Sequence, residues 1–210
     1  ADLNNYRTNK RRLANWGAFF VFDMTEKREI SFNNFNEEGR IANQQLSATL
    51  QDIPPHHQRA WRAGLKPFAA IIHRHLHKQQ ETVEFDNKKF HLEHIAPQTP
   101  TEEWVISLVG RQEDASQIYE SSIRKAGNLI LLDKGLNIGA QQKPFAKKCK
   151  EHYKSATFFG LTSDLIEMTD WTTDDIESRT QWLAEMFDII WSPEKASLSV
   201  THYSQWLKNA

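Results

Sequence analysis

The segment that most constrains the fold runs from Thr82 to Gln98. On both sides of a turn signal at Asp86-Asn87, apolar residues alternate with polar or charged ones, which is typical of a β-hairpin. The alternating apolar positions are Val83 and Phe85 before the turn, and Phe90 and Leu92 after it. The hairpin is predicted to end at Glu93-His94, and Pro97 then favours a turn.

A second short strand is predicted further along the chain. Gly127-Asn128 is a common turn dipeptide, and Leu129 to Leu132 is a short apolar run that suits a buried strand. A helix that carries Asn137 near its start is predicted to follow. The order hairpin, loop, strand, helix predicts a ββα unit.

Helical patterns surround this unit, so the predicted fold class is mainly α with a small β-hairpin, a ββα core embedded in helices. The chain divides into a helical N-terminal region, 1–80, and a second domain, 81–210. Thr172 or Thr173 is predicted to cap a last long helix, whose first turn carries Asp174 and Asp175. The predicted helices cover about 5–22, 36–50, 56–79 after Pro54-Pro55, 101–108, 144–155 and this last segment, which buries Ile176, Trp182, Leu183, Met186, Phe187 and Ile190.

The charge of the chain is balanced overall but uneven along its length. The 26 basic and 27 acidic residues give no bulk signal for nucleic acid. Between Lys143 and Lys154 there are five lysines and one acid, whereas Asp164 to Asp188 contains eight acids and one arginine. The basic stretch could attract phosphate, although two solvated helix faces would give the same pattern.

Other features narrow the class of protein. The single cysteine, Cys149, excludes an internal disulfide and a zinc ribbon of paired cysteines. No apolar run approaches the roughly 20 residues that span a bilayer, and no signal peptide is visible. We therefore expect a soluble, cytoplasmic protein with no membrane partner. The opening Ala-Asp-Leu lacks an initiator Met, which indicates a fragment of a longer protein.

The residues around the two predicted strands suit metal-dependent hydrolysis of a phosphodiester. A histidine can take a proton from water near neutral pH, which predicts His94 as general base. Carboxylate and amide oxygens suit a hard cation, so Glu93 and Asn137 are predicted ligands of Mg²⁺ or Mn²⁺. Neighbours on an extended strand point to opposite faces, so the chain is predicted to bend between Glu93 and His94 with help from Pro97. Asn128 is predicted to tie the loop so that the His94 ring keeps its orientation.

The lysine-rich stretch supplies candidates for contacts with DNA. Lys147 is the predicted contact of the scissile phosphate, with Lys143 and Lys148 as weaker candidates. Lys143, Lys148 and Lys150 are the predicted DNA-binding residues.

The order His94, Asn128, Asn137 resembles the HNH (His-Me finger) nuclease motif. With the flanking residues, the chain resembles the nuclease domain at the C-terminal end of GmrSD-type modification-dependent restriction endonucleases over about Phe90 to Trp191. The residues that carry this resemblance are Glu-His-Ile-x-Pro-Gln at 93–98, Trp104, Gly-Asn-Leu-x-Leu-Leu at 127–132, Asn137, Pro144-Phe145 with Lys147, Tyr153, Trp171-Thr172, Ile176, Arg179, Leu183 and Trp191.

The resemblance implies a DNA endonuclease or nickase that acts as the effector domain of a bacterial anti-phage restriction system, often against modified DNA. It implies a divalent cation, Mg²⁺ or Mn²⁺, and an NTPase sensor domain in the same or a partner chain. No Gly-rich phosphate loop is present here, so region 1–80 corresponds to a linker toward that missing domain.

Two other interpretations stay open at this point. Glu93 stands where many HNH nucleases have Asp or His, so the chain could be a DNA-binding module with a decayed or scaffold-only nuclease site. His73 and His77, one turn apart on a helix, could share a metal in an unrelated metallohydrolase. For these histidines a solvated helix face is the prediction.

Overall fold

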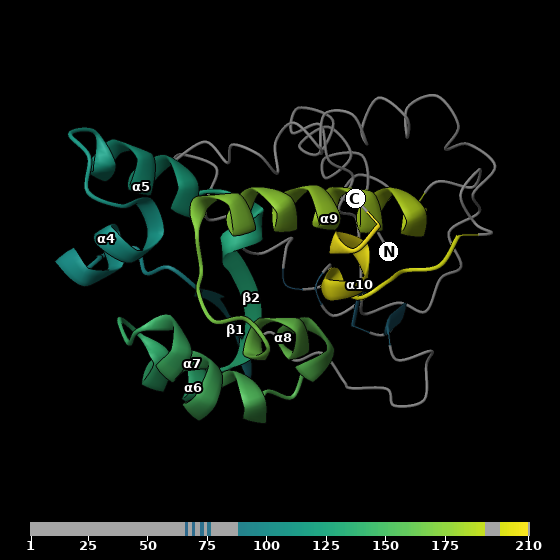
Figure 1. Ribbon diagram of the computed structural model, residues 1–210. Coiled ribbons are helices and arrows are strands. Elements are labelled where there is room, and N and C mark those ends of the chain that lie inside the picture. The colour runs from purple at the N-terminus through teal and green to yellow at the C-terminus, as the bar shows by residue number, and fades with distance from the viewer. Residues whose placement is uncertain are drawn as a thin grey trace, which may run out of the picture.

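The computed structural model describes residues 88–191 and 198–209, together with the isolated positions Lys66, Ala69, Ile72, His73, His75 and Leu76. The described part is mainly helical around one two-stranded sheet (Figure 1). In chain order its elements are β1 (Phe90–His94), α4 (Glu102–Val109), α5 (Ala115–Ile123), η3 (Ala126–Asn128), β2 (Leu129–Asp133), α6 (Lys134–Ala140), α7 (Phe145–Glu151), η4 (Tyr153–Ser155), α8 (Phe159–Ile166), α9 (Thr173–Trp191) and α10 (Tyr203–Leu207).

The two strands pair antiparallel, with Phe90 opposite Asp133 and His94 opposite Leu129. The predicted fold class, mainly α with a small antiparallel sheet, is confirmed, and strands form where the sequence predicts them at 90–92 and 129–132, whereas the ββα core stays a prediction. The other predicted strand of the hairpin, Val83–Phe85, lies outside the described residues, as do the helices predicted for 5–22 and 36–50 and most of 56–79. The described positions between Lys66 and Leu76 that carry an assignment are helical, as predicted.

The sheet separates two hydrophobic clusters. Leu129 and Leu131 belong to a cluster with Phe158, Trp182 and Met186, whereas the alternate strand residues face a second cluster. The second cluster is built on Ile130, Leu132, Trp104, Phe145, Tyr153 and Trp171. In Figure 1, α9 crosses one end of the strands, and α6, α7 and α8 lie toward the other end. Each face of the sheet is therefore covered.

Side-chain caps mark the start of two helices, and the cap of α9 by Thr172 is among the predictions. Thr101 Oγ1 accepts from Trp104 N at the start of α4. At the start of α9, Thr172 Oγ1 accepts from Asp175 N, and the Asp175 carboxylate accepts from Thr172 N at 2.8 Å, a reciprocal capping pair. Of the predicted core of α9, Ile176, Trp182, Leu183 and Met186 are buried and Ile190 is partly buried, while the Phe187 side chain lies outside the described residues.

One histidine of the run before β1 is buried rather than exposed to solvent. His73 is 6% exposed and its ring packs edge-on against Phe158, with the centroids 5.1 Å apart. The predicted exposure is therefore wrong for His73, because this turn packs against the core. His75 is exposed as predicted, and His77 lies outside the described residues. Within the described ranges, no helix is long and apolar enough to cross a membrane.

Candidate active site at the end of β1

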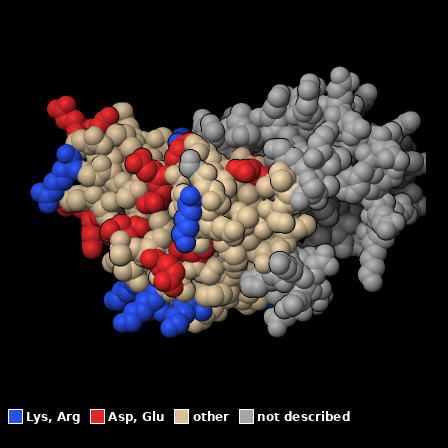
Figure 2. All heavy atoms as spheres, turned by 45° about the vertical axis from the view of Figure 1, so that its right-hand side comes forward, with Lys and Arg blue, Asp and Glu red and all other residues tan. Residues whose placement is uncertain are grey.

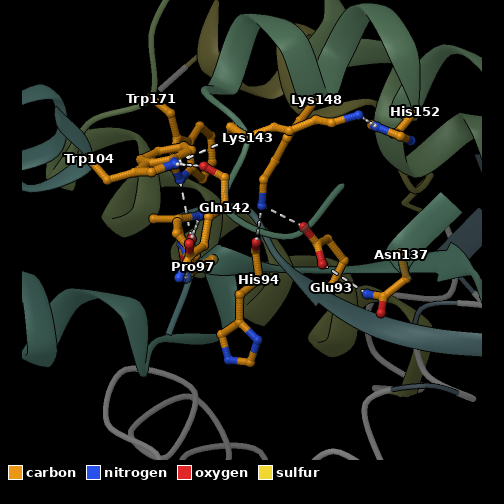
Figure 3. A network of polar contacts seen from close by, with 12 residues as sticks. Glu93, His94, Pro97, Trp104, Asn137, Gln142, Lys143, Lys148, His152 and Trp171 are labelled. Atoms are coloured by element: carbon orange, nitrogen blue, oxygen red, sulfur yellow. Dashed lines mark hydrogen bonds and ion pairs between the residues drawn. The ribbon is translucent and has the colours of Figure 1, made fainter. Parts of the chain in front are cut away.

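Glu93 is a buried carboxylate held from two sides (Figure 3). Lys148 Nζ donates to its Oε1 at 2.6 Å, and Asn137 Nδ2 donates to its Oε2 at 2.8 Å. Burial raises the pKa of Glu93 and lowers the pKa of Lys148, and in each case the attraction of the partner opposes the shift. Residues 44 and 55 positions away in sequence thus converge on one carboxylate.

The side chain of His94 leaves the strand on the opposite side from Glu93. β1 stays extended through His94, whose strand partner is Leu129, whereas Glu93 pairs with Ile130. Figure 3 shows the His94 ring pointing away from the carboxylate. The predicted bend between Glu93 and His94 is therefore wrong. The chain turns only after His94, where Ile95 N donates to Asn128 O at 2.9 Å.

Asn128 holds the turn that follows His94. Its Oδ1 accepts from Ala96 N at 2.8 Å, and its Nδ2 donates to Ala96 O at 2.9 Å and to Ile123 O at 3.3 Å. Trp171 Nε1 donates to the same Oδ1 at 3.3 Å. The fully buried amide thus links the turn, the end of α5 and the segment before α9.

We expect Asn128→Ala to lower the free energy of unfolding by about 2 kcal/mol, because buried partners at Ala96 and Trp171 lose their hydrogen bonds. The midpoint of thermal unfolding should fall by about 6 °C. The exposed Asn209→Ala is the control, because only its backbone N–H makes a hydrogen bond, to Trp206 O. An unchanged midpoint for Asn128→Ala would show that this amide does not hold the turn.

The predicted DNA-contacting lysines have different environments. Lys147 and Lys150 are exposed on α7, and Lys143 is half-buried before it. Lys148 is 0% exposed because it lies on the inward face of α7 with Phe145 and Cys149. Figure 2 shows basic side chains at the lower edge of the described part, the end where Figure 1 places α6 and α7. An exposed basic edge thus adjoins the site.

Lys143 is held in a cluster with two residues at the end of α7. Its Nζ donates to Glu151 Oε2 at 2.8 Å and lies 2.9 Å from His152 Nε2. Since an ammonium only donates, this ring nitrogen must accept. Burial, followed by the charge of Lys143, lowers the pKa of His152, which fits a neutral ring.

The donors around Glu93 have the chemistry of a hard-cation site with few protein ligands. Mg²⁺ commonly uses one or two carboxylates and completes its shell with waters and substrate phosphate. The Glu93 carboxylate and the Asn137 amide fit that description, provided that Asn137 turns its Oδ1 rather than its Nδ2 toward the ion. Among the residues that the structure describes, no group of three or more His, Cys, Asp or Glu could hold a metal.

Cys149 is buried, which fits the prediction that it is inert. It is 5% exposed, and its Sγ donates to Leu165 O at 3.4 Å. Burial raises the pKa of the thiol to about 12, so almost no thiolate forms near neutral pH.

Sequence reasoning named Lys148, Trp104 and Arg179 but did not find the contacts through which they support the site. Lys148 was predicted as a weak DNA contact, although the helical spacing of Phe145 and Cys149 could have placed it on the inward face. Trp104 Nε1 donates to the carbonyls of Gln142 and Lys143 and so fixes the loop before α7. Arg179, fully buried on α9, donates from Nη1 to Gly127 O at 2.6 Å and to Leu129 O at 2.8 Å. No local pattern signals the last two contacts.

The fold and the site define a helical domain around a two-stranded sheet, with a carboxylate–amide pair and a histidine at one strand end. Residues 57–186 match the family described as GmrSD restriction endonucleases, C-terminal domain, and the chain belongs to this family. Family membership makes it a nuclease domain with DNA as its substrate class. No curated protein and no solved structure gives a significant match. The division of the chain at residues 80 and 81 stays a prediction.

Proposed function

We propose that the chain is a metal-dependent DNA endonuclease or nickase of the HNH type, the effector domain of a bacterial anti-phage restriction system. The observation that carries the proposal is the hydrogen bond from Asn137 Nδ2 to Glu93 Oε2, 2.8 Å long, at the residue that precedes His94 in a chain of this family. Mg²⁺ or Mn²⁺ is the proposed cofactor. An NTPase sensor domain, in the same or a partner chain, is the proposed source of selectivity, and the cytoplasm is the proposed location.

The proposed roles follow from the chemistry of each side chain and from the family to which the chain belongs. His94 takes the proton of the attacking water. Glu93 and Asn137 hold the cation, which would relieve charge on the phosphate when bound. Asn128 keeps the turn after His94 in place through its bonds to Ala96.

The lysines are proposed to act on the DNA from the exposed edge. Lys147 would contact the scissile phosphate, while Lys143 and Lys150 would contact the neighbouring backbone by charge alone. Lys148 is the exception, because its buried ion pair with Glu93 supports a role inside the site.

A second candidate is a DNA-binding module whose site no longer cuts. The specific observation in its favour is that both oxygens of Glu93 already have nitrogen partners, Lys148 and Asn137. A cation must share or displace these partners. This alternative predicts that the protein retards DNA on a gel but leaves it uncut.

Conversion of supercoiled plasmid separates the two candidates. The protein is incubated with plasmid and Mg²⁺ or Mn²⁺, and in parallel with chelator. We expect nicked or linear product only with metal. Retardation without product under either metal would favour the binding module. A product that forms equally in chelator would contradict the proposed metal dependence.

A further inference from the structure

Lys148 is the most deeply buried charged group of the site. Its side chain is 0% exposed, and its ammonium has two partners at the end of β1. It donates to Glu93 Oε1 at 2.6 Å and to His94 O at 2.9 Å (Figure 3). The indole of Trp104 lies 5.7 Å away, ring centroid to Nζ. One cation therefore contacts both the predicted metal ligand and the backbone of the predicted base.

The pairing balances a charge that would otherwise be costly. The Glu93 side chain is 7% exposed, and its other partner, Asn137, is neutral. A buried carboxylate that loses its only cationic partner is strongly destabilising, because nothing replaces its lost hydration. The lysines on either side cannot substitute, since Lys147 and Lys150 point to solvent from the same helix.

The contact with His94 ties the two halves of the site together. The His94 carbonyl lies where β1 ends, immediately before the turn that Asn128 holds. A shift of the Lys148 ammonium would therefore move the Glu93 carboxylate and the backbone that carries the His94 ring together. This coupling is a geometric property of α7, because Phe145 and Cys149 anchor the same inward face.

We propose that Lys148 is the positioning residue of this site. Its ammonium balances the charge of Glu93 and holds the His94 carbonyl in place. A bound divalent cation can take over the first of these roles, the balance of charge, but not the second. This inference rests on the proposed function in one respect, the assignment of Glu93 as a metal ligand. It predicts that the stability of the protein becomes metal-dependent when the ammonium is removed.

The test is thermal unfolding of the protein without DNA, in chelator and in saturating Mn²⁺. The variants are Lys148→Met, Lys148→Arg, Glu93→Gln and the double variant Lys148→Met/Glu93→Gln, with the exposed Lys154→Met as control. In chelator, Lys148→Met should lower the midpoint by about 10 °C, because it leaves a buried charge unpaired. The double variant should recover much of that loss, since it removes both charges.

The shift in thermal midpoint on adding Mn²⁺ separates the proposed role from that of a purely structural ion pair, which Mn²⁺ would not affect. It should raise the midpoint of Lys148→Met well above any shift seen for the wild type, and it should leave the double variant unchanged. Lys148→Arg keeps a cation and should behave like the wild type. If Lys148→Met folds only when Mn²⁺ is present, adding chelator should unfold it, which supports the same conclusion.

Two results would overturn the inference. One is a wild-type midpoint for Lys148→Met in chelator. The other is a lowered midpoint that Mn²⁺ raises no more than it raises that of the wild type, which would leave only a structural ion pair. Plasmid cleavage by the wild type distinguishes this failure from failure of the proposed function. If the wild type cuts plasmid but Mn²⁺ does not stabilise Lys148→Met more than the wild type, only the inference about Lys148 is contradicted. If Mn²⁺ does stabilise Lys148→Met more but the wild type does not cut, only the proposed nuclease activity is contradicted.

Discussion

Replacing His94 by alanine is expected to lower the rate of metal-dependent plasmid cleavage by about 10²–10⁴-fold, the usual contribution of a positioned general base. The physical reason is that attack on phosphorus needs a deprotonated water, and His94 is the histidine at the end of β1, next in sequence to Glu93. Folding should survive, because the half-buried ring can be removed without touching the bonds that Lys148 and Asn128 make.

The measurement is the initial rate of supercoil loss in Mg²⁺ and in Mn²⁺, with the thermal midpoint of each variant recorded alongside. His202→Ala is the matched control, since His202 pairs with Asp164 beside α10 and has no part in the proposed chemistry. Its rate should equal that of the wild type. A His94→Ala protein that cuts at the wild-type rate would remove this residue as the base, and equal retardation of DNA by both proteins would localise a loss to the chemical step.

The geometry explains why the site could be predicted only in part. Glu93, His94, Asn128 and Asn137 carry recognisable chemistry, and the short strands and helix caps that position them depend on neighbours in sequence. The direction in which these side chains point depends instead on which residues the strand pairs with. A bend between Glu93 and His94 follows from the sequence only if both side chains serve one metal site from the same side of the strand. In the structure, pairing of His94 with Leu129 keeps the strand extended. The turn begins only at Ile95, whose N–H donates to Asn128 O.

Long-range contacts set the remaining features. In the lysine-rich stretch, the sequence favours Lys147 as the contact of the scissile phosphate, whereas packing of Phe145 and Cys149 turns Lys148 inward to Glu93. Arg179 is 2% exposed and supports the start of β2 from a helix 50 residues away. Such contacts exist only once the helices have docked, so no window of the sequence contains them. The same docking makes the turn before β2 sensitive to a single methyl group.

Gly127→Ala should be the most damaging small substitution near the site. A Cβ at this position would overlap the carbonyl oxygen of Ile176 and lie 2.6 Å from Thr180 Oγ1 and 2.8 Å from Thr180 N. These atoms belong to α9, and two of the three are backbone, so they cannot turn away as a long side chain could. We expect a loss of at least about 3 kcal/mol in the free energy of unfolding, the upper range for overpacking in a core.

We expect the steric clash at Gly127 to lower the cleavage activity as well as the stability. Gly127 N donates to Thr180 Oγ1 at 3.0 Å, and its carbonyl accepts from Arg179, so the methyl group pushes apart the contacts that hold Asn128 in place. Cleavage should fall along with the thermal midpoint, which we expect to drop by about 6–12 °C.

Gly135→Ala provides the control with the same chemical change. Gly135 lies within α6, and a Cβ there would meet no atom within 4 Å. Alanine is favoured over glycine inside a helix by about 0.5–1 kcal/mol, so this variant should melt at or slightly above the wild-type temperature. Equal midpoints for the two variants would show that α9 does not press on the turn before β2. A large difference would show that the stability of the site depends on the close approach of Gly127 to α9.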